Sequence, residues 1–359
     1  MKVKPRYIVN ILGLAGLYII ASKLGLLLAF GVSQITVVGP PTGLALAALV
    51  LYGYDLWPGI LLGAFLANLL ANEPSGVALG IAIGSTLEAV TGAVLLRRIV
   101  HFKPALDRAR SVIGLTVLAA LLSTMVSASI GTISLAMGGL LSWGAQPIAW
   151  LLWWIGDMAS VLLLAPFLFA WHSGWRQVGR KNSAEFAALL IGTMVVAVII
   201  FFGHLKPLGN NPQLQYLIFP FIIWAAFRFK QLGVTAVSII TSIIAVLGTV
   251  GGGGPFAGFG TTQQQLVTLF HMILLSTSGL FMAVAVLQRE FYEQGLVRQA
   301  EGLRVARDKI LLELDARAEH QERLKDANER ITKILSRLLN ETPGESNRDS
   351  ELGRKNPRF

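Results

Sequence analysis

Residues 271–310 read HMILLSTSGLFMAVAVLQREFYEQGLVRQAEGLRVARDKI, and the character of the sequence changes near the middle of this stretch. From residue 7 to residue 288 the chain consists almost entirely of apolar segments long enough for membrane helices, whereas from Arg289 onward it shows water-soluble heptads. The sequence therefore predicts a membrane bundle joined to a cytosolic helical rod. Such a junction is typical of signalling proteins, because a helix that leaves a bundle directly into a coiled coil carries small movements outward.

The composition indicates an integral membrane protein. Apolar residues make up 54% of the chain and charged residues only 14%, against about 25% charged in soluble domains. Most of the net charge of +10 arises before Arg289, where 15 Lys and Arg face 6 Asp and Glu; from Arg289 onward the counts are 15 and 14. A basic excess in membrane loops favours anionic lipids as partners and argues against nucleic-acid binding. The absence of cysteine excludes disulfides and thiolate metal sites.

The apolar segments predict an all-α fold, a polytopic bundle of about eight to ten transmembrane spans. We expect the first segment to be a retained helix and not a signal peptide, because its 24 residues exceed the length of a signal-peptide core. Three segments are shorter than the ~20 residues needed to cross a bilayer, so eight spans with re-entrant pieces is the alternative to ten. The ten segments are 7–30, 40–53, 57–72, 76–97, 111–138, 148–171, 184–203, 214–229, 232–251 and 264–288.

Loop charges predict the orientation of the bundle. With the N-terminus inside and ten crossings, the loops on the inner side hold most of the Lys and Arg, and those on the outer side hold only Lys206. The positive-inside bias then places both termini in the cytoplasm. Glycine and proline gather on the predicted outer side, as in Gly39-Pro40-Pro41. Irregular backbone at membrane depth is tolerated where protein or a water-filled cavity satisfies it, so we expect either an outward-facing concavity or simple tight turns.

The segment 291–340 carries a heptad pattern that predicts a coiled coil. Most core positions are aliphatic, and Asn328 at a core position favours a parallel two-stranded homodimer in fixed register. The alternative is a single amphipathic helix that lies on the membrane or on a cytoplasmic partner. The two sets of core positions are Leu296, Leu303, Ile310, Arg317, Leu324, Ile331 and Leu338, and Ala300, Arg307, Leu314, Gln321, Asn328 and Leu335. The chain thus divides into a membrane domain (1–290), a coiled-coil helix (291–340) and a tail (341–359) that we expect to be disordered.

Ionisable groups within membrane spans are the best indication of a ligand site, because a charge in a bilayer is costly. Glu88 and Asp157 lie in the outer halves of their predicted spans, with Asn68 nearer the outer end and His271 at a similar depth on the last span. If these helices adjoin, the site suits a cationic ligand, a hydrogen-bonding ligand or a proton. The alternative for each residue is a structural role, as a buried polar side chain that hydrogen-bonds one helix to another.

Two tryptophans adjoin this layer. Trp153 and Trp154 precede Asp157 and are candidates for an aromatic wall beside a bound cation, or for interfacial anchors. The sequence shows no enzyme signature. No paired His or Cys metal ligands occur, and the glycines at 251–254 are not followed by the Lys of a phosphate-binding loop. We therefore expect no catalytic residue, no metal site and no cofactor.

Several short motifs follow one another along the membrane segments. They are Pro40-Pro41-Thr42-Gly43, Trp57-Pro58-Gly59, residues 63–68 (GAFLAN), Gly84 with Glu88, residues 153–157 (WWIGD), Phe219-Pro220, residues 224–228 (WAAFR) and Gly254-Pro255-Phe256. In this order they resemble the first type of bacterial membrane-associated sensor (MASE) domain. The resemblance covers residues 10–290. It implies an inner-membrane input module, usually fused to histidine kinase, PAS or diguanylate cyclase domains. This sequence retains the connecting rod and shows no output domain.

The leading hypothesis is a non-catalytic sensory protein. A ligand site in the outer half of the bundle shifts the last membrane helix and the coiled coil, and a cytoplasmic partner binds the coiled coil and responds to the change. A small-molecule transporter is the alternative suggested by short helices and midplane carboxylates. A histidine kinase or diguanylate cyclase truncated after its input module is a third hypothesis.

Overall fold

The computed structural model describes residues 5–27, 39–174, 183–202, 212–257 and 259–341. Every regular element among these residues is helical, which confirms the all-α prediction. The chain divides into two compact units, Met1–Glu290 and Phe291–Phe359. Residues 342–359 of the expected disordered tail lie outside the described residues.

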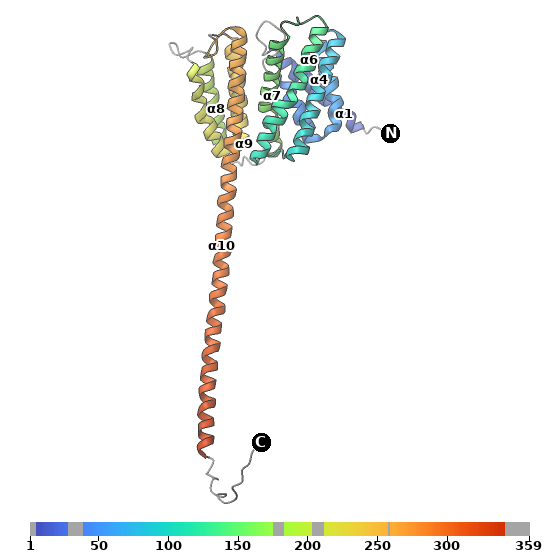
Figure 1. Cartoon of the computed structure of the whole chain (residues 1–359). Coiled ribbons are helices and arrows are strands. Elements are labelled where there is room, and N and C mark those ends of the chain that lie inside the picture. The colour runs from blue at the N-terminus through green and yellow to red at the C-terminus, as the bar shows by residue number, and fades with distance from the viewer. Residues whose placement is uncertain (1–4, 28–38, 175–182, 203–211, 258, 342–359) are drawn as a thin grey trace, which may run out of the picture. The chain divides into compact units, whose positions relative to one another are not determined.

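The first unit is a bundle of helices (Figure 1). Six segments are single helices long and apolar enough to cross a membrane, although the second and third contain π-helical turns. They are α1 (Pro5–Leu27), α4 (Ser75–Leu95) with the π segment Leu96–Val100, α5 to α6 (Ala109–Gly114, π segment Leu115–Ser123, Thr124–Met137), α7 (Gln146–Gly174), α8 (Ser183–Phe201) and the first part of α10 (Thr261–Glu341). The chain is therefore a multi-pass membrane protein.

A seventh candidate span folds back on itself. The 3₁₀ turn Pro212–Ile218 leads into α9 (Phe219–Val250), where Lys230 adopts non-helical angles, φ 53° and ψ −137°. A Cβ added to Gly233 would lie 3.2 Å from the Cβ of Ala225, a contact that a straight helix cannot make between residues eight apart. The arms 219–229 and 231–250 therefore pack side by side.

Two short helices complete the membrane unit. They are α2 (Pro40–Tyr52) and α3 (Trp57–Leu70), preceded by the turn Tyr54–Leu56. Both match apolar segments that the sequence marks as too short to cross a bilayer unaided. With the two arms of α9 counted separately, the short helices and the six single helices together account for all ten apolar segments.

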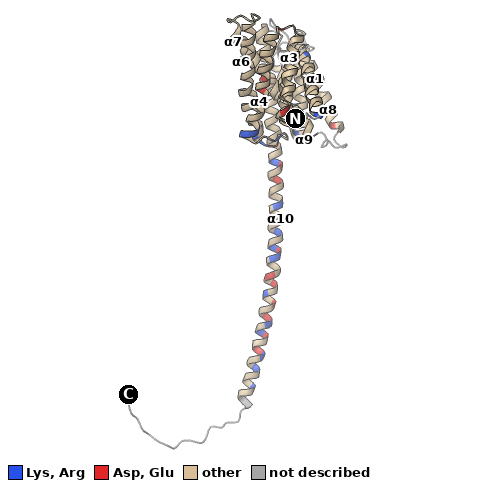
Figure 2. Ribbon diagram, turned by 90° about the vertical axis from the view of Figure 1, so that its right-hand side faces the viewer, with Lys and Arg blue, Asp and Glu red and all other residues tan. Residues whose placement is uncertain are grey.

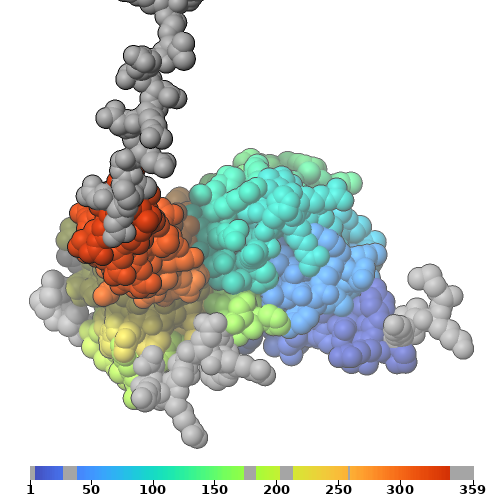
Figure 3. Space-filling view, turned by 90° about the horizontal axis from the view of Figure 1, so that it is seen from below, coloured from blue at the N-terminus to red at the C-terminus, as the bar shows by residue number. Residues whose placement is uncertain are grey.

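The bundle consists of two lobes that lie side by side when it is seen from its end (Figure 3). In the N-terminal lobe, α1 packs on α3, α3 and α6 pack on α4, and α2 packs on α7. The C-terminal lobe contains α8, α9 and the first part of α10 around a second apolar core. A third cluster joins the lobes through Ile155 and Ala159 of α7, Val246 of α9 and Leu269 of α10.

Glycines permit the closest helix contacts. A Cβ added to Gly43 in α2 would lie 2.5 Å from the backbone oxygen of Ser160 in α7, and the N–H of Gly43 donates to Ser160 Oγ at 3.1 Å. Gly63 and Gly84 lie against α1 and α6 in the same way, as the sequence interpretation of helix packing requires.

One end of the bundle collects most of the Lys and Arg residues (Figure 2). We call it the basic end. Hydrogen bonds and an ion pair tie its loops and helix ends together. These contacts are Tyr7 Oη to Asp55 O (2.9 Å), Arg97 to Val50 O (2.9 Å), Gln231 Nε2 to Leu106 O (2.7 Å) and Lys230 Nζ to Glu290 Oε2 (2.6 Å).

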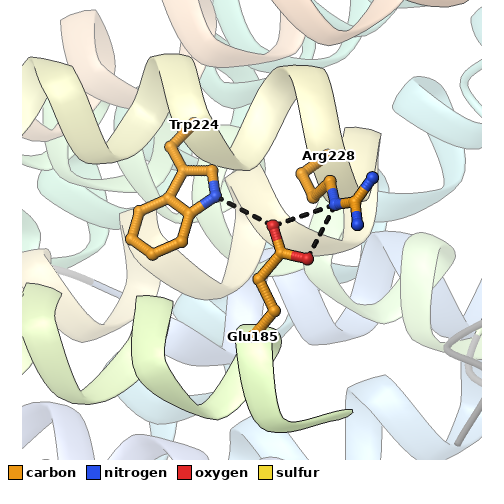
Figure 4. A network of polar contacts seen from close by, with 3 residues as sticks. All are labelled: Glu185, Trp224 and Arg228. Atoms are coloured by element: carbon orange, nitrogen blue, oxygen red, sulfur yellow. Dashed lines mark hydrogen bonds and ion pairs between the residues drawn. The ribbon is translucent and has the colours of Figure 1, made fainter. Parts of the chain in front are cut away.

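A further network at the basic end joins α8 to the first arm of α9 (Figure 4). Glu185 accepts hydrogen bonds from Trp224 Nε1 at 3.2 Å and from Arg228 Nε at 2.7 and 2.9 Å. The Arg228 side chain is 52% exposed, and ion pairs this open contribute little to stability because water screens them. We therefore assign the network a role in helix packing.

The second unit contains the remainder of α10. Every side chain from 291 to 339 is exposed, including the aliphatic heptad positions Leu303, Ile310 and Leu324. A single helix therefore runs through the segment in which the sequence predicts a coiled coil, and its apolar stripe is uncovered in the described chain.

Candidate functional site

The central residue of the site is Asp157, in the middle of α7. Its side chain is only 5% exposed, and Thr42 Oγ1 donates a hydrogen bond of 2.7 Å to its Oδ1. A Cβ added to Gly39 would lie 2.7 Å from the same oxygen, so the N-terminus of α2 abuts the carboxyl group. The positive end of the helix dipole favours a carboxylate there, and the Pro40-Pro41 pair fixes the helical start.

The second oxygen of Asp157 lacks a partner. Oδ2 is buried and has no hydrogen bond, although Trp153 and Ser127 flank the same carboxyl group. A buried acceptor left unpaired costs about 1–3 kcal/mol. Asp157 thus retains an unused capacity to accept a hydrogen bond or to pair with a cation.

Glu88 of α4 is a second buried carboxyl group close to the first. It is 2% exposed, and its Oε1 has no hydrogen-bond partner. Ser127 of α6 lies beside both carboxyl groups, and the charge of Asp157 acts on Glu88. The structure therefore brings together the two carboxylates that the sequence singles out.

A cavity of about 510 Å³ opens beside Asp157. It lies among α1, α2, α3, α4, α6 and α7, toward the end opposite the basic end. Among the described residues, no Lys, Arg or His lines it. Its polar and ionisable lining residues are Tyr18, Ser22, Thr42, Asn68, Asn72, Glu73, Ser85, Ser127, Trp153 and Asp157.

Asn68 and Glu73 form part of this lining near the end of α3. Asn68 Nδ2 donates to Ala64 O of its own helix at 2.8 Å, so its amide is anchored at the cavity wall. Glu73 precedes α4, and its Oε2 is buried without a hydrogen bond. Burial raises the pKa of the Glu73 carboxyl above its ordinary value.

The two tryptophans occupy different positions. The ring of Trp153 lies against Gly131, where an added Cβ would come within 2.6 Å of it, and Trp153 lines the cavity. Trp154 is absent from the lining; it stacks on Trp150 with 5.3 Å between ring centroids and donates to Leu121 O at 2.9 Å. Of the two tryptophans, only Trp153 lies at the wall of the cavity.

His271 lies apart from the carboxylates, although the sequence places it at the same depth. It is 5% exposed and sits between Phe201 and Phe256 of the C-terminal lobe, 5.6 and 5.7 Å from their ring centroids. Its Nε2 has no hydrogen bond. Depth along α10 was available from the sequence, but the face of the helix that carries His271 was not.

The cavity residues that sequence reasoning missed include Tyr18, Thr42, Glu73, Ser85 and Ser127. Thr42 stands within one of the motifs that carry the family resemblance, so a signal for it existed. The two serines and Tyr18 gave none, because hydroxyl groups in membrane helices commonly bond to their own backbone, as Thr132 does with Ala128 O.

Comparison with known proteins identifies a family. The family model MASE1 matches residues 11–290, which is more than three quarters of the chain and includes every residue of the cavity. No curated protein and no solved structure matches the chain.

Proposed function

This chain belongs to the MASE1 family of membrane-associated sensory domains, and from that premise we propose that its stimulus is a ligand bound in the cavity beside Asp157. The sensory input role follows from the family. The cavity as the ligand site, α10 as the output and a partner that reads it are our inferences.

The direct contact of α7 with both the cavity and α10 carries this proposal. Asp157 faces the cavity, and one turn further along α7 the carbonyl of Leu162 accepts a hydrogen bond from Ser276 Oγ of α10. Ile155 and Ala159 also pack in one cluster with Leu269 and Met272 of α10. A ligand that shifts α7 therefore acts on α10 without any intermediate element.

The basic end supports a bacterial inner-membrane orientation with both termini in the cytoplasm, because Lys and Arg favour the cytoplasmic side. The cavity then faces the periplasm. Lys230 pairs with Glu290 at the point where α10 leaves the membrane unit, which holds the exit of α10 against the turn of α9.

The exposed stripe on α10 supports a parallel homodimer. Leu303, Ile310 and Leu324 are more than half exposed, and such a stripe at heptad spacing is stabilised by a second copy. Asn328 at a core position favours two strands in register. Ligand binding alters this rod only as far as the two states differ in ligand affinity.

A cysteine scan along the rod tests the proposal, since the chain has no native cysteine. We expect disulfide crosslinks in native membranes at Leu303 and Ile310, and none at the outward positions Asp308 and Arg323. In an Asp157→Asn background with unchanged protein levels, we expect the crosslinking pattern to change. Crosslinks without heptad periodicity contradict the dimer, and an unchanged pattern contradicts coupling to the cavity.

A further inference from the structure

We infer that the cavity binds an organic ammonium ion, with its charged head at Asp157. This inference rests on the proposed function and specifies the class of ligand.

The charge of the cavity favours a cation. Asp157 and Glu73 line it, Glu88 lies beside Asp157 through Ser127, and none of the described lining residues is basic. Asp157 Oδ2 and Glu88 Oε1 are buried without hydrogen bonds. Buried polar atoms in proteins are normally hydrogen-bonded, so a cationic donor supplies the partner that these two carboxyl oxygens lack among the described residues.

The arrangement of the acids favours an organic cation over a metal ion. A metal such as Ca²⁺ takes six to eight oxygen ligands at short range. Among the described residues, no group of three or more His, Cys, Asp or Glu side chains is placed to hold a metal ion. An ammonium head needs only one or two charge contacts, and the volume of about 510 Å³ falls within the usual range for small-molecule sites.

The rest of the lining suits the body of such a ligand. Trp153 lies beside Asp157 and lines the cavity, and an indole attracts ammonium groups through its π face. Apolar side chains form another part of the wall, and they match carbon substituents on the nitrogen. These residues are Leu26, Pro40, Pro41, Ile81, Leu135, Leu140 and Leu141.

Charge-selective labelling of a cavity cysteine tests this inference. Ser85 is half-buried and lines the cavity, so Ser85→Cys places the thiol there. Two methanethiosulfonate reagents of similar size, one with a trimethylammonium group and one with a sulfonate, are applied to spheroplasts. Each rate is divided by the rate at Ser142→Cys, an exposed position outside the lining.

We expect the cationic reagent to be preferred by about tenfold or more, as in clefts lined by one sign of charge. Asp157→Asn should reduce this preference, and so should Glu73→Gln at a less buried position. Tetramethylammonium should slow labelling by the neutral methyl reagent at Ser85→Cys but not at Ser142→Cys.

The outcomes separate this inference from the proposed function. Equal normalised rates for both charged reagents, without protection by tetramethylammonium, overturn the ammonium ligand and leave an accessible site. If the neutral reagent fails to label Ser85→Cys in folded protein, both the ammonium ligand and the periplasmic cavity are overturned.

Discussion

Replacing Gly43 by Ala tests the contact that holds α2 against α7. The added methyl group would lie 2.5 Å from Ser160 O and 2.9 Å from Leu164 Cβ. The first atom belongs to the backbone, so the helices must separate. Overpacking of this kind costs about 1–3 kcal/mol, offset by up to about 1 kcal/mol from the better helix propensity of Ala.

Gly16→Ala is the matched control. Gly16 lies within α1, and nothing lies within 4 Å of a Cβ added there. Both variants gain the same propensity, so the difference between them isolates the clash.

We expect Gly43→Ala to be about 1–3 kcal/mol less stable than Gly16→Ala, measured as the free energy of unfolding in mixed detergent micelles. Because Thr42 adjoins Gly43 and donates to Asp157, labelling in the cavity should change in the same variant. Two variants within about 0.5 kcal/mol of each other would refute the close packing of α2 on α7.

Three other changes are predicted from the described contacts. Gln231→Leu should lower the free energy of unfolding by about 1–3 kcal/mol, because it leaves the buried carbonyl of Leu106 without its hydrogen-bond donor. A loss below about 0.5 kcal/mol contradicts this prediction. Reversing either charge of the Lys230–Glu290 pair should lower the free energy of unfolding by less than about 1 kcal/mol, because both side chains are a third or more exposed. Reversing both charges should restore the stability. A double variant that is no more stable than the single variants argues against the ion pair. Because the pKa of Glu73 is raised in the folded protein, its contribution to stability is present at low pH and is lost as the pH rises above about 4.5. Glu73→Gln should therefore reduce the slope of the free energy of unfolding against pH in this range. An unchanged slope contradicts the prediction.

The fold was largely predictable because lipid demands long apolar segments. All ten segments correspond to helical pieces, and the break at Lys230 was visible as a charge between two apolar runs. Hydropathy does not report which helices adjoin, so neither the contact of α2 with α7 nor the division into two lobes followed from the sequence. Those features depend on side-chain fit, such as that of Gly43 against Ser160.

Site residues could be predicted only where burying the side chain in a membrane costs much free energy. Glu88 and Asp157 stood out because a carboxylate in a membrane span requires a reason, and the structure places them beside one another. Trp153 joined them and Trp154 did not, although they are adjacent in sequence, since successive helical residues point about 100° apart. For the same reason depth alone misled for His271.

If the cavity governs α10, covalent occupation of the cavity should alter the rod, which can be measured directly. Spheroplasts carrying Ser85→Cys together with Ile310→Cys are treated with the impermeant trimethylammonium reagent, and rod crosslinking at position 310 is then measured with a permeant oxidant. We expect modification to change the crosslinking rate, whereas the same treatment of Ser142→Cys with Ile310→Cys should leave it unchanged. Full modification of position 85 with an unaltered crosslinking rate would contradict this expectation.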